Sequence, residues 1–308
     1  MPEILSLMCV HAHPDDEHST AGSLLKYAGE GAMTSIIYGT RGECGLNRDP
    51  RLVLAPWETL ADVRTRKELK NATALLKVGF VNFLGYRDSG MAGTVDNENS
   101  HAFCNADMEE ACRRLVLNIR KLRPQVLVTY NENGGYGHPD HIMCNRVTTA
   151  AFELAGDPDF AWDDGERPWQ PKKLYYTTQS RENWQRMRQM MEQAGFEDTL
   201  GGPARRDPAT VGTPEAEITA HIDVTQYVQL KRQALLQHRS QVLGTRWEKL
   251  PEDIWRAGYS NEYFMRARCL VDAPDRETDL FAGLRDEAIP AADYTLRFAQ
   301  PVGTHFVA

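Results

Sequence analysis

The 308-residue chain lacks an excess of basic charge and any long apolar run. Its net charge of −8 argues against a nucleic-acid backbone as the main partner, because such a partner requires a basic patch. A membrane-spanning helix needs an apolar run of about 18 residues, and no run reaches that length. The first apolar run, residues 4–10, follows Glu3 and has no basic start, so no signal peptide is predicted either.

Paired cysteine motifs, internal repeats and low-complexity tracts are also missing. The six cysteines are irregularly spaced, and no two of them form a Cys-x-x-Cys pair. A scattered set of this kind favours a reducing compartment over a disulfide framework. We therefore expect a cytoplasmic protein that does not bind a membrane.

What the chain does have is a regular alternation of short apolar runs and helical periodicity. Strands are expected at residues 4–10, 34–38, 80–84, 125–130 and 173–177, and helices at residues 20–32, 58–77, 106–122 and 141–155. Such alternation implies right-handed crossovers and a mostly parallel sheet that is covered on both faces. The predicted fold is α/β, with a doubly wound sheet in the order 3-2-1-4-5.

Composition shifts near residue 201, where residues 201–214 are rich in glycine and proline and predict a linker. We therefore expect a hydrolase core over residues 1–200. Residues 201–308 would form a C-terminal extension packed on the core, either as a cap or as an oligomer surface. Within it, residues 224–241 predict a helix, whereas residues 261–271 fit a helix or a strand.

Two short histidine motifs, His13-Pro-Asp-Asp-Glu17 and His138-Pro-Asp-His141, follow the first and fourth predicted strands. Taken alone, the first could be an acidic helix start and the second two surface histidines in a loop. In the predicted order, however, strands 1 and 4 are neighbours where the winding reverses, and ligands bind at that point. The fold prediction alone therefore brings the motifs together.

The residue types in these motifs suit a catalytic zinc, which takes three protein ligands and leaves one position open for water. His13, Asp16 and His141 can be the ligands, although iron(II) can use the same set. Asp15 is then a spare carboxylate that can accept the proton of the attacking water, and His138 can protonate the leaving amine.

Two further residues of the second motif have expected roles. Asp140 can orient the imidazole of His138 and hold its charge. Tyr136, after the flexible pair Gly134-Gly135, can donate a hydrogen bond to a developing oxyanion.

Candidates outside the two motifs are less specific. Asp88 follows the third strand on the same side of the sheet, although a turn aspartate is an equal interpretation. Arg64 and Arg66 can clamp a hydroxyl or phosphate or be solvated. The loop 39–45 does not have the Gly-x-Gly-x-x-Gly pattern, which disfavours a nicotinamide cofactor.

Residues 10–17 (VHAHPDDE) and 135–141 (GYGHPDH) resemble the LmbE/PIG-L family of zinc-dependent N-acetylglucosaminyl deacetylases. Residues 84–91 and 129–135 are similar to the mycothiol branch, which holds an N-acetyl-glucosaminyl-inositol deacetylase and the mycothiol S-conjugate amidase. The segments most similar to the amidase are residues 132–136, 168–169, 174–176 and 279–283.

The resemblance implies a Rossmann-like fold and zinc held by the three ligands named above. It implies Asp15 as general base, His138 as the acid or charge stabiliser, and Tyr136 on the oxyanion. Asp88 and Met91 match positions that line the sugar pocket. The family also implies a substrate-binding arginine from the pair Arg64/Arg66, and we assign Arg66. The family pattern is matched loosely in the loop 39–47 and poorly over residues 181–260, on which substrate choice is expected to depend.

The expected function is zinc-dependent hydrolysis of the amide of an N-acylated glucosamine, with a mycothiol-type thiol conjugate as one candidate substrate. A simple N-acetylglucosaminide deacetylase with another aglycone is an alternative. An alternative from another class is a nucleotide-sugar binding or transfer protein that uses Asp15 and Asp16 as a metal–diphosphate handle and prefers magnesium or manganese. The expected partner is a small N-acyl amino sugar. The sequence leaves open whether the chain forms a homo-oligomer.

Overall fold

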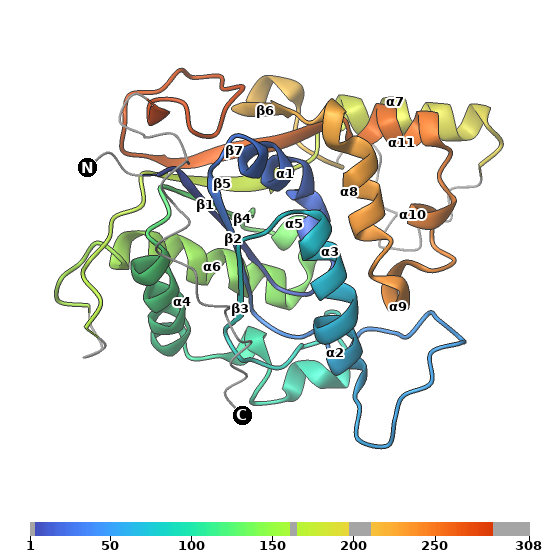
Figure 1. Ribbon diagram of the computed structural model, residues 1–308, viewed down its shortest axis with the longest axis horizontal. Coiled ribbons are helices and arrows are strands. Elements are labelled where there is room, and N and C mark those ends of the chain that lie inside the picture. Colours follow the sequence, from blue (N-terminus) through green and yellow to red (C-terminus); the bar gives the residue numbers. More distant parts are fainter. Residues whose placement is uncertain (1–3, 161–164, 197–210, 286–308) are drawn as a thin grey trace.

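The computed structural model describes residues 4–160, 165–196 and 211–285 (Figure 1). Its centre is a seven-stranded sheet in the order β3-β2-β1-β4-β5-β7-β6. The strands are β1 (Ser6–His11), β2 (Met33–Tyr38), β3 (Phe80–Phe83), β4 (Val126–Tyr130), β5 (Lys173–Thr178), β6 (Ala220–Asp223) and β7 (Asn261–Cys269). Strands β1 to β5 pair in parallel, and β7 and β6 follow antiparallel. The predicted α/β class and the order 3-2-1-4-5 are confirmed.

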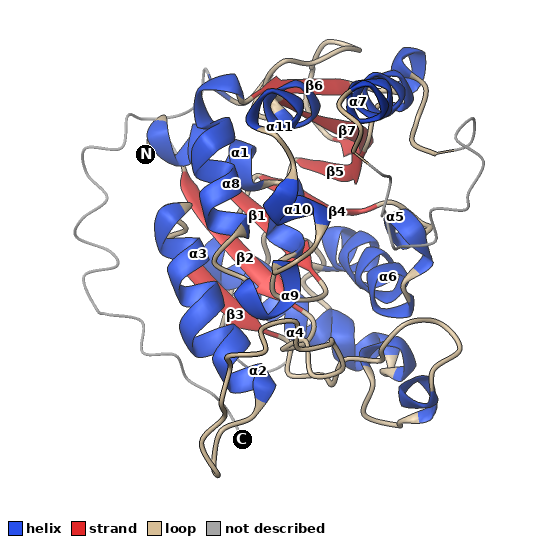
Figure 2. Cartoon of the chain, turned by 90° about the vertical axis from the view of Figure 1, so that its right-hand side faces the viewer, coloured by secondary structure: helices blue, strands red, loops and turns tan. Residues whose placement is uncertain are grey.

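Helices cover both faces of the sheet (Figures 1 and 2). Their bounds are α1 (Ala21–Gly29), α2 (Leu60–Val63), α3 (Lys70–Leu75), α4 (Met108–Leu122), α5 (Gly134–Gly137), α6 (Pro139–Leu154), α7 (Arg181–Gln193), α8 (Val228–Leu235), α9 (Arg239–Val242), α10 (Arg246–Lys249) and α11 (Glu252–Tyr259). Met8 and Val10 of β1 pack with α4 and α6, whereas Leu7 and Cys9 pack with α1, α3 and α8 on the other face. A strand buried on both faces explains why β1 is apolar without alternation.

The helix predicted at residues 58–77 consists of α2 and α3 joined by a π-helical turn, Arg64–Leu69. Its start is a capping box: the Thr59 hydroxyl accepts from the Asp62 backbone N–H at 3.1 Å, and the Asp62 carboxylate accepts from the Thr59 N–H at 3.0 Å. Such π-helical turns change the helical phase and are frequent at functional sites. Arg64, the first residue of this turn, is buried.

The C-terminal part continues the sheet. The ambiguous segment 261–271 contains strand β7, and the helix predicted at residues 224–241 is divided into α8 and α9. Helix α7 shares an apolar cluster with α8 and α11, formed around Met187, Val228 and Trp255. The expected boundary at residue 200 lies outside the described residues, so that division stays a prediction.

All six cysteines are free thiols, and none of the helices that the structure describes is long and apolar enough to cross a bilayer.

Candidate active site

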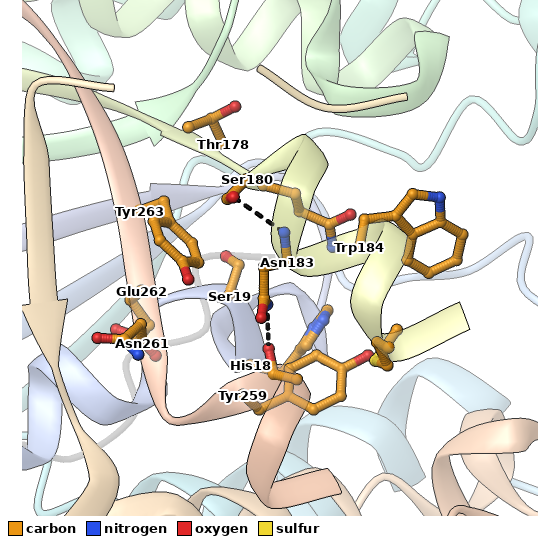
Figure 3. Close-up of a pocket in the computed structure, with 13 residues that line it drawn as sticks. His18, Ser19, Thr178, Ser180, Asn183, Trp184, Tyr259, Asn261, Glu262 and Tyr263 are labelled. Atoms are coloured by element: carbon orange, nitrogen blue, oxygen red, sulfur yellow. Dashed lines mark hydrogen bonds between the residues drawn. The ribbon is translucent and has the colours of Figure 1, made fainter. Parts of the chain in front are cut away.

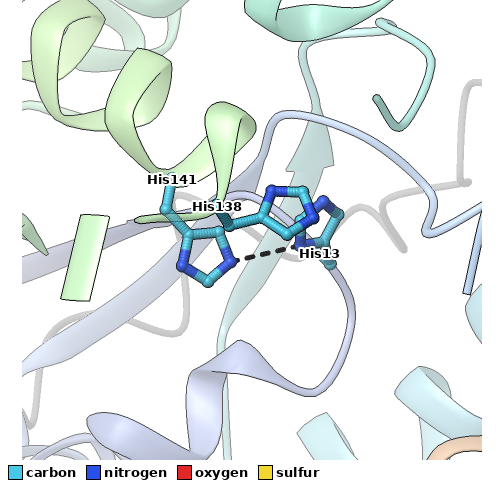
Figure 4. A group of neighbouring side chains, drawn as sticks. All are labelled: His13, His138 and His141. Atoms are coloured by element: carbon cyan, nitrogen blue, oxygen red, sulfur yellow. Dashed lines mark hydrogen bonds between the residues drawn. The ribbon is translucent and has the colours of Figure 1, made fainter. Parts of the chain in front are cut away.

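The two histidine motifs meet at the carboxyl ends of β1 and β4. His13 follows β1, and His141 lies in the first turn of α6 (Figure 4). Three side-chain atoms converge there: His13 Nδ1 and Asp16 Oδ2 lie 3.3 Å apart, His141 Nε2 and Asp16 Oδ2 3.4 Å, and His141 Nε2 and His13 Nδ1 3.3 Å. The structure therefore brings together three side chains that the sequence predicts as metal ligands. We call them the ligand triangle.

The ligand triangle has the dimensions of a zinc site. A tetrahedral zinc ion with nitrogen and oxygen ligands at about 2.0–2.2 Å separates its ligand atoms by roughly 3.3–3.6 Å. One carboxylate oxygen and two imidazole nitrogens are also ligands that zinc and iron(II) share. A ring nitrogen of His138 lies within 4.8 Å of ring nitrogens of His13 and His141. These residues therefore fit a bound metal ion.

The second nitrogen of each imidazole in the triangle has its own hydrogen-bond acceptor. His141 Nδ1 lies 3.1 Å from the Gly134 carbonyl, and His13 Nε2 lies 3.1 Å from Asp140 Oδ2. Both contacts assign the proton to the nitrogen outside the triangle and leave a lone pair pointing into it. This is the arrangement that orients histidine ligands in metal sites.

Asp140 is buried. The sequence predicts that it orients the imidazole of His138, but among the described contacts its carboxylate has other partners. Its carboxylate accepts from the backbone N–H groups of Ser89 and Cys104, at 2.8 and 3.0 Å, as well as from His13. His138 is the N-cap of α6, and its Nδ1 accepts from the Asp140 backbone N–H at 3.2 Å. Because this backbone bond holds the His138 ring, the Asp140 side chain is left to orient His13.

Asp15 lies between the ligands His13 and Asp16 in a left-handed backbone conformation, with φ 106° and ψ −21°. A non-glycine residue in this region costs about 1–3 kcal/mol, so the surroundings must hold it there. Burial, followed by the nearby charge of Asp16, raises the pKa of Asp15 well above its ordinary value. The Asp15 carboxyl group therefore holds a proton more readily than an ordinary aspartate, which suits a group that must take up a proton and release it again.

The imidazole of His138 is predominantly uncharged at neutral pH. Burial and the charges of His13 and His141 lower its pKa to about 4. Tyr136 is 40% exposed, and its ring centre lies 5.0 Å from that of His141 and 6.2 Å from that of His138. Burial raises the pKa of Tyr136 above its ordinary value, which keeps the hydroxyl protonated as a hydrogen-bond donor.

Asp88 lies beside His13, with its Oδ1 3.5 Å from His13 Nε2. Its carboxylate accepts from the backbone N–H groups of Cys44 and Gly90, at 3.1 and 2.8 Å. Burial raises the Asp88 pKa, but the hydrogen bond and charge of His13, together with the backbone donors, outweigh burial and lower it. Met91, on the same loop, is 41% exposed.

Arg64 and Arg66 lie in different surroundings, and these do not favour the assignment of Arg66 to substrate binding. The Arg66 side chain is 62% exposed, with its Nε 3.7 Å from Asp62 Oδ1, and the structure does not place it in the ligand cluster. Arg64 is buried, and its guanidinium donates to the carbonyls of Gly42 and Leu46. Its charge interacts with those of Asp15 and Asp88. Arg64 is therefore the member of the pair that faces the site.

Tyr130, the last residue of β4, was not singled out from the sequence. Its hydroxyl donates to Asp16 Oδ2 at 2.7 Å and accepts from the Ala12 backbone N–H at 2.8 Å. Its ring stacks on His141 with the centroids 4.1 Å apart. Two signals were available: its position at the end of strand 4, and its place in residues 129–135, which resemble the mycothiol branch.

A cavity of about 70 Å³ lies at the carboxyl end of β5 (Figure 3). Ser19 is one of its lining residues, and the Ser19 hydroxyl donates to the Asp16 carbonyl at 2.9 Å. Aromatic rings of Trp184 and Tyr263 lie beside the hydroxyl and amide groups that line it. The lining carboxylate, Glu262, is engaged by the backbone N–H groups at the start of α1. This chemistry fits a neutral, hydroxylated group.

The fold and the site define a class, an α/β protein with a candidate metal site at the switch point of its sheet. Residues 8–152 match the family model PIG-L, GlcNAc-PI de-N-acetylase. The chain is 41% identical over 291 residues to "1D-myo-inositol 2-acetamido-2-deoxy-alpha-D-glucopyranoside deacetylase 1" of Catenulispora acidiphila, covering 90% of this chain and 89% of that protein. A Thermobifida fusca deacetylase of the same substrate name is 39% identical, covering 90% and 98%. The chain belongs to the PIG-L family, as the motifs predict, and amide hydrolysis is confirmed as its class of reaction.

Solved structures show the same fold at lower identity. The conserved protein TT1542 from Thermus thermophilus has a TM-score of 0.55 at 21% identity, covering 88% of this chain and 98% of that chain. The N,N'-diacetylchitobiose deacetylase from Pyrococcus horikoshii has a TM-score of 0.56 at 20% identity, covering 85% and 84%. These likenesses support the fold.

Proposed function

We propose that this protein is a zinc-dependent deacetylase that removes the acetyl group from an N-acetylglucosamine linked to inositol. The observation that carries the proposal is the ligand triangle with the Asp15 carboxyl group next to it. The names of the relatives at about 40% identity support the substrate. A cytoplasmic location, the absence of nucleic-acid or membrane partners, and homo-oligomer formation stay predictions.

The chain's own residues divide the chemistry among them. His13, Asp16 and His141 would hold the zinc, which when bound supplies Lewis acidity that polarises the amide carbonyl and lowers the pKa of water. Asp15 accepts a proton from the attacking water and, because its pKa is raised, can return that proton to the leaving amine. The sequence predicts that His138 protonates the leaving amine. Because its pKa is lowered to about 4, we assign the neutral imidazole instead to stabilising the negative charge that develops on the carbonyl oxygen.

The remaining residues bind the substrate. Tyr136 also donates to the developing oxyanion. We assign Asp88 and Met91 to the sugar. Arg64 is the arginine closer to the site, but its guanidinium is buried and donates to Gly42, Leu46 and Ser240, so we assign it to holding the loop beside the site. The cavity beside Ser19, which is lined by hydroxyl, amide and aromatic groups together with His18 and Glu262, is our candidate site for the inositol ring.

The two alternatives have less support. The mycothiol S-conjugate amidase shares the chemistry and differs in the acyl group, but the relatives named above are deacetylases. The nucleotide-sugar alternative requires Asp15 and Asp16 to bind magnesium through oxygen ligands. Asp16 instead faces two imidazole nitrogens, which is a donor set for zinc.

The test compares the wild-type protein with Asp15→Asn on N-acetylglucosaminyl-inositol, measuring released acetate and bound zinc. We expect Asp15→Asn to retain zinc and to lose about 10²- to 10⁴-fold in kcat, because it removes the proton acceptor. Asp107→Asn is the matched control, since Asn also caps a helix and Asp107 only caps α4. Full turnover by Asp15→Asn would refute the base, and faster cleavage of a thiol conjugate than of the acetyl group would favour the amidase.

A further inference from the structure

The segment His238–Gln241, at the start of α9, contacts the loop that carries the ligand triangle. His238 Nε2 forms a short hydrogen bond with Glu17 Oε1, and both side chains are buried. Gln241 Nε2 donates to the Pro14 carbonyl at 2.7 Å. A segment from the C-terminal part of the chain therefore holds the N-terminal histidine motif at two points.

These two contacts hold the same peptide group. The Pro14 carbonyl, which accepts from Gln241, belongs to the peptide whose N–H group is that of Asp15. That N–H donates to Glu17 Oε2 at 2.9 Å, and Glu17 is in turn bonded to His238. The Pro14–Asp15 peptide is thus bonded at its carbonyl and at its N–H. Because the orientation of this peptide determines φ of Asp15, the contacts select the left-handed conformation.

The segment that makes these contacts is itself anchored. Ser240 donates from its backbone N–H to Glu68 Oε1 at 2.6 Å and from its hydroxyl to Glu68 Oε2 at 2.8 Å. Arg64 Nε donates to the Ser240 hydroxyl at 3.2 Å. Both partners belong to the π-helical turn, so the segment is fixed between that turn and the histidine motif. It is therefore rigid enough to position a neighbour.

We propose that His238 and Gln241 are positioning residues, which hold the Pro14–Asp15 peptide so that the Asp15 carboxylate faces the attacking water. The proposal rests on the proposed function, in which Asp15 is the base. Neither residue contacts the ligand triangle among the described contacts, so their effect passes through Asp15. Loss of either contact frees Asp15 to rotate toward an ordinary backbone conformation, with the metal ligands still in place.

The first experiment replaces Gln241 by Leu, which removes the amide donor at similar volume. We expect kcat to fall roughly 10- to 100-fold, the loss typical of a small misplacement of a catalytic group. KM should change by less than about twofold, and the zinc content should match that of the wild type. Gln237→Leu is the matched control, because Gln237 is equally half-buried and its amide donates to the Gln233 carbonyl within α8 and its continuation. Unchanged kcat in Gln241→Leu, or loss of zinc in parallel with activity, would overturn the proposal.

The second experiment repeats Gln241→Leu in the Asp15→Asn background. If Gln241 acts through Asp15, the double variant has the same kcat as Asp15→Asn alone, because the group being positioned is already removed. An equal fold-loss in both backgrounds means a general structural effect and refutes the proposal. Full turnover by Asp15→Asn alone would refute the proposed function instead, so the two failures are distinguishable.

His238 provides an independent check. His238→Gln keeps an N–H donor toward Glu17, whereas His238→Leu removes it. We expect the Gln variant to retain more kcat than the Leu variant at equal zinc content. Equal kcat values in the two variants, both folded, would contradict the role of His238. If the His238→Leu variant does not fold, the Gln241 experiments decide the proposal.

Discussion

Two buried polar clusters lie at opposite strand ends of the same, mostly parallel sheet. At the amino end of β5, the ammonium of Lys173 pairs with the carboxylate of Glu277 and donates to the Ala282 carbonyl at 3.0 Å. The Tyr175 hydroxyl donates to the other Glu277 oxygen at 2.6 Å. At the carboxyl end of β1 and β4 lies the ligand triangle.

The difference between the clusters lies in how their atoms are satisfied. In the Lys173 cluster the Glu277 carboxylate faces two cations, Lys173 and Arg266, whose Nη1 lies 3.4 Å from Glu277 Oε1. Both carboxylate oxygens have donors, so the cluster is complete. In the ligand triangle, the two imidazoles direct lone pairs toward the Asp16 carboxylate, whose Oδ2 accepts from the Tyr130 hydroxyl and the His13 backbone N–H. The ring N–H groups of the imidazoles donate elsewhere. Buried polar groups that satisfy one another contribute to stability, whereas converging lone pairs require a cation.

Metal removal should give the largest effect and separate the clusters most clearly. Dialysis against a chelator is expected to lower deacetylase activity by at least about 10³-fold, because a catalytic zinc contributes several kcal/mol to stabilising the transition state. Added zinc should restore activity, measured as released acetate. Activity that survives complete metal removal would show that the triangle is a structural cluster like the one around Lys173.

Lys173→Met should affect stability and leave the chemistry unchanged. Removing one partner of a buried ion pair costs about 3–5 kcal/mol. We expect the lower end of this range, because Arg266 Nη1 stays 3.4 Å from the Glu277 carboxylate when Lys173 is lost. The free energy of unfolding in urea measures this loss, with Lys172→Met at the neighbouring half-buried position as control. The kcat of the folded variant should equal that of the wild type; a large fall in kcat at full zinc content would link this cluster to catalysis.

A smaller effect is expected in the pH dependence of stability near the triangle. Burial raises the pKa of Glu17, but the charge of His238 and the hydrogen bonds from His238 and Tyr38 outweigh it and lower the pKa to about 2. A carboxylate with a lowered pKa stabilises the fold above its unfolded value of 4.5, and this contribution is lost as the pH falls toward 2. Urea unfolding between these pH values should be less pH-dependent in Glu17→Gln. An unchanged slope would show that Glu17 is not ionised in the native state.

The sequence could predict the sheet order and the meeting of the two motifs, because both follow from strands that are buried on two faces. It could not choose between Arg64 and Arg66, since the π-helical turn changes which side chain faces inward. It expected Asp140 to orient His138, whereas the Asp140 carboxylate is hydrogen-bonded to His13, because a carboxylate at a helix start can reach either imidazole. Which arginine faces inward depends on the helical phase, and which imidazole Asp140 contacts depends on side-chain rotamers. The spacing of residues in the sequence does not determine either.

The contribution of His238 was hidden for a different reason. Its partner Glu17 lies 221 positions earlier in the chain, and a lone histidine has no motif around it. Strand β7 was ambiguous because its side chains are mostly half-buried rather than alternating. The long-range contacts of the C-terminal part could therefore be found only in three dimensions.

The position of α9, far along the chain from the motif that it contacts, has a consequence for protein engineering. The region that matches the family model, residues 8–152, contains the three residues of the ligand triangle and Asp15, but neither His238 nor Gln241. A protein shortened to that region would leave the Pro14 carbonyl and the Glu17 carboxylate without these two partners. Exchange of C-terminal segments between relatives, made to alter substrate range, must therefore keep the residues corresponding to 238–241 and the histidine motif as a matched pair.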